Sequence, residues 1–428
     1  MYGTRRAVRK SNGCSNMHIV SLYYVAKISG LAPFSFRDDK VSRGSPSDKI
    51  YSLVFAALAL PISVVVPALF PASAVTAVSE IAELTESFLW YLGFFGGVIP
   101  VATFASKEGI IVEIIKTLTK VQEIIHRSKM RNDDRHKSRV LAIQIGLAIF
   151  GFLCLNCGAA IAYWYSILDF WTLGVIVTTY LYCFTPHLVI IIFLNVLSFV
   201  ENYLKELNNG LMNFCQPDRD LTLVRFRGDR IENFLEPRTG HETTEIEILL
   251  EIEFVYHKLL NVIEQIMELF SLPILLTVGY YFLNLLFCCF YIFTTYVNLS
   301  KLSATATYQV IGRIFWITLY FLELFAIARV CSSVQNTGKA TAIILHKVWL
   351  KSHHNKMLDE IQMLSLQLLQ RPLTISAFGF FSLDYSYLYK IFCAMVAYFV
   401  IMVQLDSSKS EPSALQHQPS TWNVTIPI

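Results

Sequence analysis

Residues 376–405 read SAFGFFSLDYSYLYKIFCAMVAYFVIMVQL, and the interpretation of the whole chain starts from this stretch. Its last part, Ile391 to Leu405, is uncharged and almost entirely apolar until Gln404. A helix over this part is about 22 Å long, which is short of a hydrocarbon layer of roughly 30 Å. Polar groups at both ends of a short span suit a helix that lines water better than one that faces lipid. We therefore interpret the stretch as a candidate pore helix.

The helical period gives this candidate two distinct faces. One stripe is polar at its ends and small or apolar between them, and its residues are Lys390, Ala394, Ala397, Ile401 and Gln404. A second face is bulky and suits lipid or a neighbouring helix, and its residues are Phe392, Val396, Phe399 and Val403. Periodicity alone leaves an ordinary packed last span as the alternative.

The composition identifies a membrane protein. The chain has 428 residues, of which 54% are hydrophobic and 16% charged, and its mean hydropathy is +0.49. Soluble proteins carry roughly 25% charged residues. The net charge of +3 gives no indication of nucleic-acid binding. Nine cysteines, mostly inside apolar runs, imply no disulfide framework.

Apolar runs predict an all-α membrane protein with seven transmembrane helices. The last span is the stretch quoted above, and the other six are 50–70, 88–105, 140–168, 170–200, 269–300 and about 302–328. Lysine and arginine are strongly asymmetric between these spans, with 31 on one side and two on the other. By the positive-inside rule the N-terminus is cytoplasmic, and seven spans then place the C-terminus outside. Two glycosylation sequons, at Asn298 and Asn423, fall on the predicted outer side.

A heptad series precedes the fifth span and predicts a long helix that projects into the cytoplasm. Its apolar residues follow steps of four and three, and they are Ile248, Ile252, Val255, Leu259, Val262, Ile266 and Leu269. A solvated helix on the membrane surface is the alternative.

The chain is therefore expected to divide into seven parts. They are a cytoplasmic N-terminal segment (1–49), transmembrane helices 1–4 (50–200), a cytoplasmic loop and anchor helix (201–268), transmembrane helices 5–6 (269–328), a cytoplasmic anchor segment (329–375), the pore-lining last helix (376–405) and an extracellular tail (406–428).

Motifs for catalysis, metal binding and cofactor binding are absent from the sequence. There is no H-E-x-x-H, no G-x-S-x-G and no complete phosphate-binding loop. We expect no enzyme activity, no metal and no cofactor.

The end of the quoted stretch resembles a known signature. Residues 397–405, AYFVIMVQL, are similar to the ending of insect gustatory receptors, which is Thr-Tyr, five hydrophobic residues and Gln-Phe. Tyr398 and Gln404 match in place, whereas Ala397 and Leu405 stand where the family has Thr and Phe. Residues 367–372 (QLLQRP), 379–384 (GFFSLD, with Gly379 and Asp384) and 30–34 (GLAPF) also resemble family segments.

This resemblance implies a seven-helix subunit of a ligand-gated cation channel. Such subunits assemble as homo- or hetero-tetramers with related receptors, around a pore lined by the last helix, in the plasma membrane of chemosensory neurons. The pore residues it implies are Ala394, Ala397, Ile401, Gln404 and Leu405. External small molecules, bitter compounds or sugars, would open the channel.

The tastant pocket is expected among the outer halves of the other helices, where aromatic rings and a few polar groups can meet a ligand. The candidate residues are Trp90, Tyr91, Tyr180, His187, Tyr291, Tyr308, Gln309, Arg313 and Trp316.

Three other classes remain as alternatives. An odorant receptor of the same superfamily is the nearest. A secondary transporter could use Arg313, Glu323 and Lys390 as a substrate path, although internal repeats are not evident. A G-protein-coupled receptor has its N-terminus outside, which the charge bias contradicts.

Overall fold

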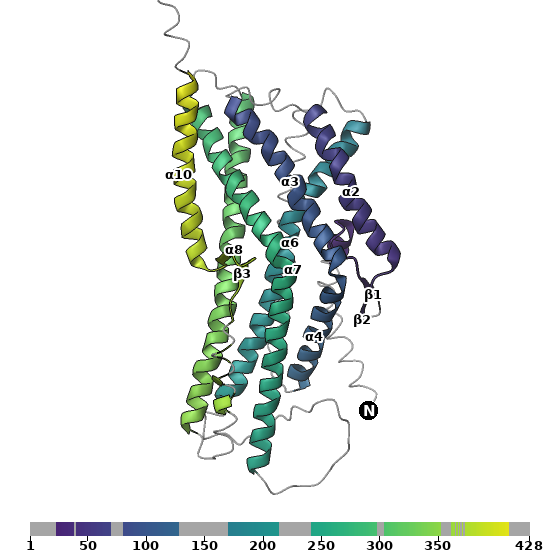
Figure 1. Cartoon of the computed structure of the whole chain (residues 1–428), viewed down its shortest axis with the longest axis vertical. Helices are drawn as coiled ribbons and strands as arrows, with labels where there is room; N and C mark the ends of the chain where they lie inside the picture. The colour runs from purple at the N-terminus through teal and green to yellow at the C-terminus, as the bar shows by residue number, and fades with distance from the viewer. Residues whose placement is uncertain are drawn as a thin grey trace, which may run out of the picture.

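A computed structural model describes residues 23–37, 40–69, 80–127, 170–213, 241–297, 304–351 and 373–410, together with parts of 361–370. Long helices run side by side along the longest axis of the molecule (Figure 1). They are α2 (Pro46–Leu69), α3 (Glu80–Ser106), α4 (Glu108–Arg127), α6 (Phe170–Asn213), α7 (His241–Val297), α8 (Ala304–Lys351) and α10 (Tyr385–Ser410). Two short antiparallel hairpins accompany them, β1 (Ser35–Arg37) with β2 (Lys40–Ser42) and β3 (Ser376–Ala377) with β4 (Phe381–Ser382).

The described part of the chain is mostly helical, so the expected class holds with one correction. The two short hairpins were not predicted. The β1–β2 hairpin leads into α2, where Ser45 takes the N-cap position and Pro46 the first helical position. The backbone N–H of Ser45 donates to the Asp48 carboxylate at 3.0 Å, which satisfies one donor at this helix end.

Four helical segments within the described residues are long and apolar enough to cross a membrane. They are 184–212, 250–297, 310–350 and 385–407. Six of the seven predicted spans fall on described helices, namely α2, α3, α6, α7, α8 and α10. The predicted span 140–168 lies outside the described residues, as do the sequons at Asn298 and Asn423.

α7 is one unbroken helix of 57 residues. The heptad series was predicted to run straight into the fifth span, and the structure confirms this. The seam is buried at Ile252, Val255, Leu259, Val262, Ile266 and Leu269. α8 is also continuous, from Ala304 to Lys351, well beyond the predicted end of the sixth span.

The core lies between α6, α7 and α8, with α3 packed on α6 and α7. Polar groups tie α6 to α8 inside it. The Thr341 hydroxyl donates to Asn208 Oδ1 at 2.7 Å, and Asn208 Nδ2 donates to the Thr337 carbonyl at 3.0 Å. Because all these groups are buried, each bond removes an otherwise costly unpaired atom and fixes the register of the two helices.

Candidate functional site

The stretch expected to form the pore helix begins with a hairpin. In the turn between β3 and β4 the Phe380 N–H donates to the Ala377 carbonyl at 2.9 Å. Phe378 and Gly379, in the three-residue loop 378–380, have φ of 50° and 76°, which lie in the left-handed region. Glycine adopts this conformation without strain, which accounts for the family-motif residue Gly379.

The last helix begins at Tyr385, so its predicted start at residue 376 was wrong. Asp384 takes the N-cap position, and its carboxylate accepts from the Ser386 N–H at 2.8 Å and from the Ser382 hydroxyl at 2.9 Å. The hydrogen bond from the Ser386 hydroxyl is the main reason that the pKa of Asp384 lies below its usual value. The charge of Lys390 lowers it further. Asp384, the second motif residue, therefore fixes where α10 starts.

One side of α10 packs on its own subunit. Leu388, Ile391 and Met395 lie against the main core. Phe399, Met402 and Val403 lie on a smaller cluster made by Leu89, Phe287, Phe290 and Tyr291. Phe399 meets Phe293 edge-on, with ring centroids 5.7 Å apart. The predicted assignment of Phe399 to a helix-packing face agrees with this contact.

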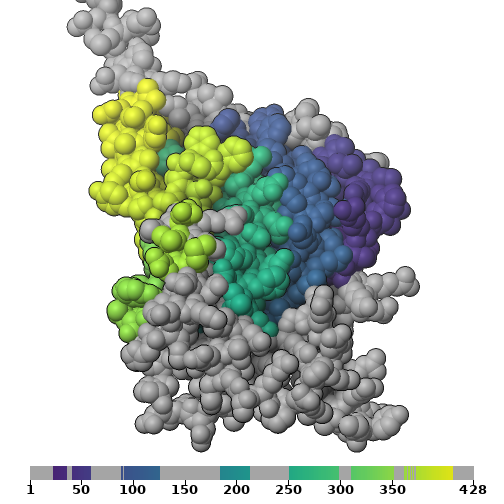
Figure 2. All heavy atoms as spheres, turned by 60° about the horizontal axis from the view of Figure 1, so that its bottom comes forward, coloured from purple at the N-terminus to yellow at the C-terminus, as the bar shows by residue number. Residues whose placement is uncertain are grey.

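The other side of α10 is apolar and unpacked. Phe392 is 64% exposed, and Val396 and Val400 are about half exposed. α10 stands at one edge of the bundle beside the upper part of α8 (Figure 1), and with the preceding hairpin it forms one edge of the surface (Figure 2).

The residues of the predicted pore stripe lie on or beside this free side. Ala397, Ile401, Gln404 and Leu405 are exposed, and Ala394 is half-buried. The motif residue Tyr398 is also half exposed, with its ring 6.1 Å from that of Phe282. The stripe is therefore available to something outside the subunit.

A buried polar cluster joins α6, α7 and α8. His187 Nδ1 lies 2.9 Å from Glu323 Oε1 and 2.8 Å from the Tyr281 hydroxyl, which itself donates to Glu323. A proton on Nδ1 lets both His187 and Tyr281 donate to the one carboxylate. The side chains are buried, with 4% of His187 and 13% of Glu323 exposed.

Aromatic rings surround this contact. Trp316 and Tyr320 lie 6.0 and 5.9 Å from His187, with nearly parallel planes, and Tyr320 lies 4.6 Å from Tyr281. We name the group formed by His187, Tyr281, Trp316, Tyr320 and Glu323 the His187 cluster. It combines charge, hydrogen bonding and ring faces in otherwise apolar helices.

The predicted ligand residues fall into separate groups. His187 and Trp316 meet in the His187 cluster. Arg313 and Tyr291 meet in a second contact, where the guanidinium lies 5.0 Å from the Tyr291 ring centroid and 4.9 Å from that of Phe287. Tyr91 is partly exposed on α3. Trp90, Tyr180, Tyr308 and Gln309 belong to α3, α6 and α8, but their side chains lie outside the described residues.

Three residues of the His187 cluster were missed as ligand candidates, namely Tyr281, Tyr320 and Glu323. Trp316, Tyr320 and Glu323 follow steps of four and three on α8, so the spacing already placed them on one face. The transporter path through Arg313, Glu323 and Lys390 is not assembled, because Arg313 contacts Phe287 and Tyr291, whereas Glu323 contacts His187 and Tyr281.

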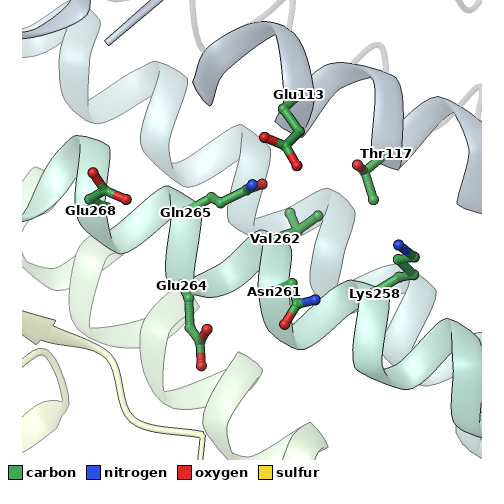
Figure 3. Close-up of a pocket in the computed structure, with 8 residues that line it drawn as sticks. All are labelled: Glu113, Thr117, Lys258, Asn261, Val262, Glu264, Gln265 and Glu268. Atoms are coloured by element: carbon green, nitrogen blue, oxygen red, sulfur yellow. The ribbon is translucent and has the colours of Figure 1, made fainter. Parts of the chain in front are cut away.

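A polar groove of about 300 Å³ lies between α4 and α7, apart from these sites. Glu113 and Thr117 point from α4 toward Gln265 and Lys258 of α7 (Figure 3). None of the predicted pore or ligand residues lines it. Among the described residues there is also no group of three His, Cys, Asp or Glu that could hold a metal ion.

The fold and these sites define a multi-pass helical membrane protein with a polar cluster inside its bundle and an apolar last helix that is packed on one side and exposed on the other. The family model described as "7tm Chemosensory receptor" matches residues 20–409. The chain belongs to this chemosensory receptor family, which is a family of receptors and not of enzymes.

Two relatives from Drosophila melanogaster are named as taste receptors. Gustatory receptor 68a is 28% identical over 231 residues, which are 52% of this chain and 56% of that protein. Gustatory and pheromone receptor 32a is 27% identical over 161 residues, which are 37% and 34% of the two chains. The chain spans about a third to somewhat over half of the length of such relatives.

The fold is similar to the solved structure of the insect olfactory receptor OR5 from Machilis hrabei. The TM-score is 0.62 at 16% identity, over 90% of this chain and 97% of that one. A second structure of that receptor, in complex with eugenol, gives a TM-score of 0.59 at 15% identity and the same coverage. At this identity the likeness concerns the fold alone.

Proposed function

We propose that this chain is a subunit of a gustatory receptor, a ligand-gated cation channel opened by external small-molecule tastants. Relatives named as gustatory receptors support the taste class. The observation that carries the channel proposal is the apolar, unpacked side of α10. An apolar helix that covers so little of its own subunit suits an assembly in which copies of α10 surround a common axis.

In this proposal four identical or related subunits form the channel, and each contributes Ala394, Ala397, Ile401, Gln404 and Leu405 to the pore. Gln404 would lie at the narrow outer part, where its amide can replace water around a passing cation. The neighbouring Leu405 would form the apolar constriction.

The proposed orientation has seven transmembrane helices, a cytoplasmic N-terminus and an extracellular C-terminus, in the plasma membrane of chemosensory neurons. The charge bias of 31 to 2 supports it. The lower halves of α7 and α8 would then be the anchor that projects into the cytoplasm (Figure 1).

We propose the His187 cluster as the place where the tastant acts. Ionisable residues inside a membrane bundle are costly and are usually functional. The complex of the olfactory receptor OR5 with eugenol supports a small-molecule ligand for a chain of this fold. The tastant opens the pore by binding the open arrangement more tightly than the closed one.

The test is expression in oocytes with an epitope at the C-terminus. Antibody binding to unpermeabilised cells reports both surface delivery and orientation. A panel of bitter compounds and sugars should then evoke a cation current. If the chain reaches the cell surface but no compound of a broad panel evokes a current, the proposal is contradicted.

Within an active receptor, Trp316→Leu should raise the tastant concentration for half-maximal current roughly tenfold, because it removes an aromatic contact. Trp349→Leu, a partly exposed tryptophan near the other end of α8, is the matched control. Equal effects of the two variants contradict the placement of the tastant.

An odorant receptor is the second candidate, favoured by the likeness of fold to an olfactory receptor. Currents evoked by volatile compounds but not by soluble tastants would favour the odorant receptor.

A further inference from the structure

The carboxylate of the His187 cluster and a contact of the pore helix belong to consecutive residues of α8. Glu323 accepts a hydrogen bond from Tyr281, and the backbone carbonyl of the next residue, Leu324, accepts one from the hydroxyl of Tyr387. Tyr387 lies in the first turn of α10. One turn of α8 therefore connects the His187 cluster to the start of the helix proposed to line the pore.

The Tyr387 side chain is held rigidly. It is only 1% exposed, and its ring stacks on Phe381 of β4 with centroids 5.9 Å apart. Leu324, whose carbonyl accepts its hydrogen bond, is buried as well. The hydroxyl therefore has no access to solvent, and it stays on the Leu324 carbonyl.

The hydrogen bond is not needed to build α8. Leu324 lies within this continuous helix, where its carbonyl is the normal acceptor for the N–H of Ala328. Tyr387 brings a donor to this carbonyl from outside the helix. The bond links α10 to α8 and also pairs the buried Tyr387 hydroxyl.

The two ends of α10 are held differently. The start is held by Tyr387 on α8 and by the β3–β4 hairpin, whose β3 strand contacts α7. Further along, Phe399, Met402 and Val403 rest on an apolar cluster, where side-chain packing holds the helix. A shift of α8 at residues 323 and 324 therefore moves the start of α10 directly.

We propose that Tyr387 is the positioning residue that couples the His187 cluster to the pore helix. This inference rests on the proposed function as a ligand-gated channel. A ligand that rearranges the contacts of Glu323 displaces the adjacent Leu324 carbonyl, and the Tyr387 hydroxyl carries the displacement into α10.

Tyr387→Phe tests this, since it removes the hydroxyl and keeps the ring. The maximal tastant-evoked current per subunit at the cell surface should fall roughly fivefold, the effect of one hydrogen bond. Tyr385→Phe is the matched control. Tyr385 lies two residues earlier on α10, its side chain is about half exposed, and its variant should behave as wild type.

A double variant distinguishes coupling from general damage. If Glu323 and Tyr387 act along one path, Glu323→Gln combined with Tyr387→Phe lowers the maximal current by less than the product of the two single effects. Fully multiplicative effects overturn the inference, as do wild-type currents in Tyr387→Phe. Wild-type chain that reaches the surface without any tastant-evoked current overturns the proposed function and this inference with it.

A backbone variant supplies the same test if Tyr387→Phe fails to reach the surface. Replacing Phe325 by its α-hydroxy acid turns the Leu324 carbonyl into an ester, a weaker acceptor. The maximal current should fall by about as much as in Tyr387→Phe, because both changes weaken the same hydrogen bond. The same replacement at Leu322, which weakens the carbonyl of Phe321, is the control. Equal currents in the two ester variants overturn the inference.

Discussion

His187 of α6 and Glu323 of α8 meet inside the helix bundle, with Nδ1 of the imidazole 2.9 Å from Oε1 of the carboxylate. Tyr281 of α7 donates to the same carboxylate. Three helices are thus joined through one carboxylate. Such a network is favourable only while all its members are paired, because an unpaired polar group in this environment is expensive.

Glu323→Ala should therefore destabilise the protein more than Glu323→Gln. The alanine variant leaves the Tyr281 hydroxyl and the His187 N–H without their acceptor, at a cost of about 1–3 kcal/mol. The glutamine variant keeps one acceptor oxygen. Thermal unfolding of detergent-purified protein measures the difference, with Glu264→Ala, an exposed carboxylate on α7, as control. Equal melting temperatures for all three variants would show that the network does not stabilise the bundle.

Gly379→Ala should destabilise the β3–β4 hairpin by about 1 kcal/mol, because its φ of 76° is strained for alanine. Gly279→Ala is a control of opposite sign. Gly279 lies within α7, with open space where a Cβ would be added, so alanine should be neutral or stabilising there. The two melting temperatures should move apart, and a shift in the same direction would contradict the turn assignment.

Acid should weaken the cap of α10. The pKa of Asp384 is lower in the folded protein than its usual value, so the folded state favours the charged form. The charged Asp384 carboxylate contributes to the free energy of unfolding above its usual pKa of about 3.9. This contribution is lost as the pH falls through the lower pKa of the folded state. Asp384→Asn should remove this part of the pH dependence while keeping a capping oxygen. Asp384→Ala should cost about 1 kcal/mol at neutral pH. Unfolding curves at pH 7 and below pH 4 test both variants. If the asparagine variant keeps the pH dependence of the wild type, ionisation of Asp384 does not contribute to stability.

Gln404→Ala should alter the tastant-evoked current, its ion selectivity or its block, and leave the melting temperature nearly unchanged because the side chain is exposed. Phe399→Ala should do the reverse. It removes a half-buried ring that contacts Phe293, with a stability loss of about 2 kcal/mol. If Gln404→Ala keeps wild-type conduction in every respect, Gln404 is not a pore residue.

Much of the fold could be predicted from the sequence. Apolar runs placed α2, α3, α6, α7, α8 and α10, and the heptad from Ile248 to Leu269 predicted the unbroken α7, because burial imposes a helical period directly on the residues. α4 lies between two predicted spans and was not placed by an apolar run. The hairpin at Ser376–Ser382 was not predicted. The run SAFGFFS is apolar like the helix after it, and the two are separated by the backbone conformation at Phe378 and Gly379 and by the Asp384 cap.

The candidate site was predictable only in part. Asp384 and Gln404 were found through their resemblance to a family signature, and His187 and Trp316 through their chemistry. Their partners Tyr281, Tyr320 and Glu323 come from α7 and α8, and their meeting with His187 depends on how three helices pack. The hydrogen bond from Tyr387 to Leu324 involves a backbone carbonyl, for which no sequence pattern exists.

In the proposed channel, α10 lines a pore shared between subunits. An experimental structure of the purified full chain in a lipid environment tests this most directly. We expect four subunits around one axis, with Gln404 of each α10 facing that axis. A monomeric chain, or an assembly in which Gln404 and the free side of α10 face lipid, would contradict it.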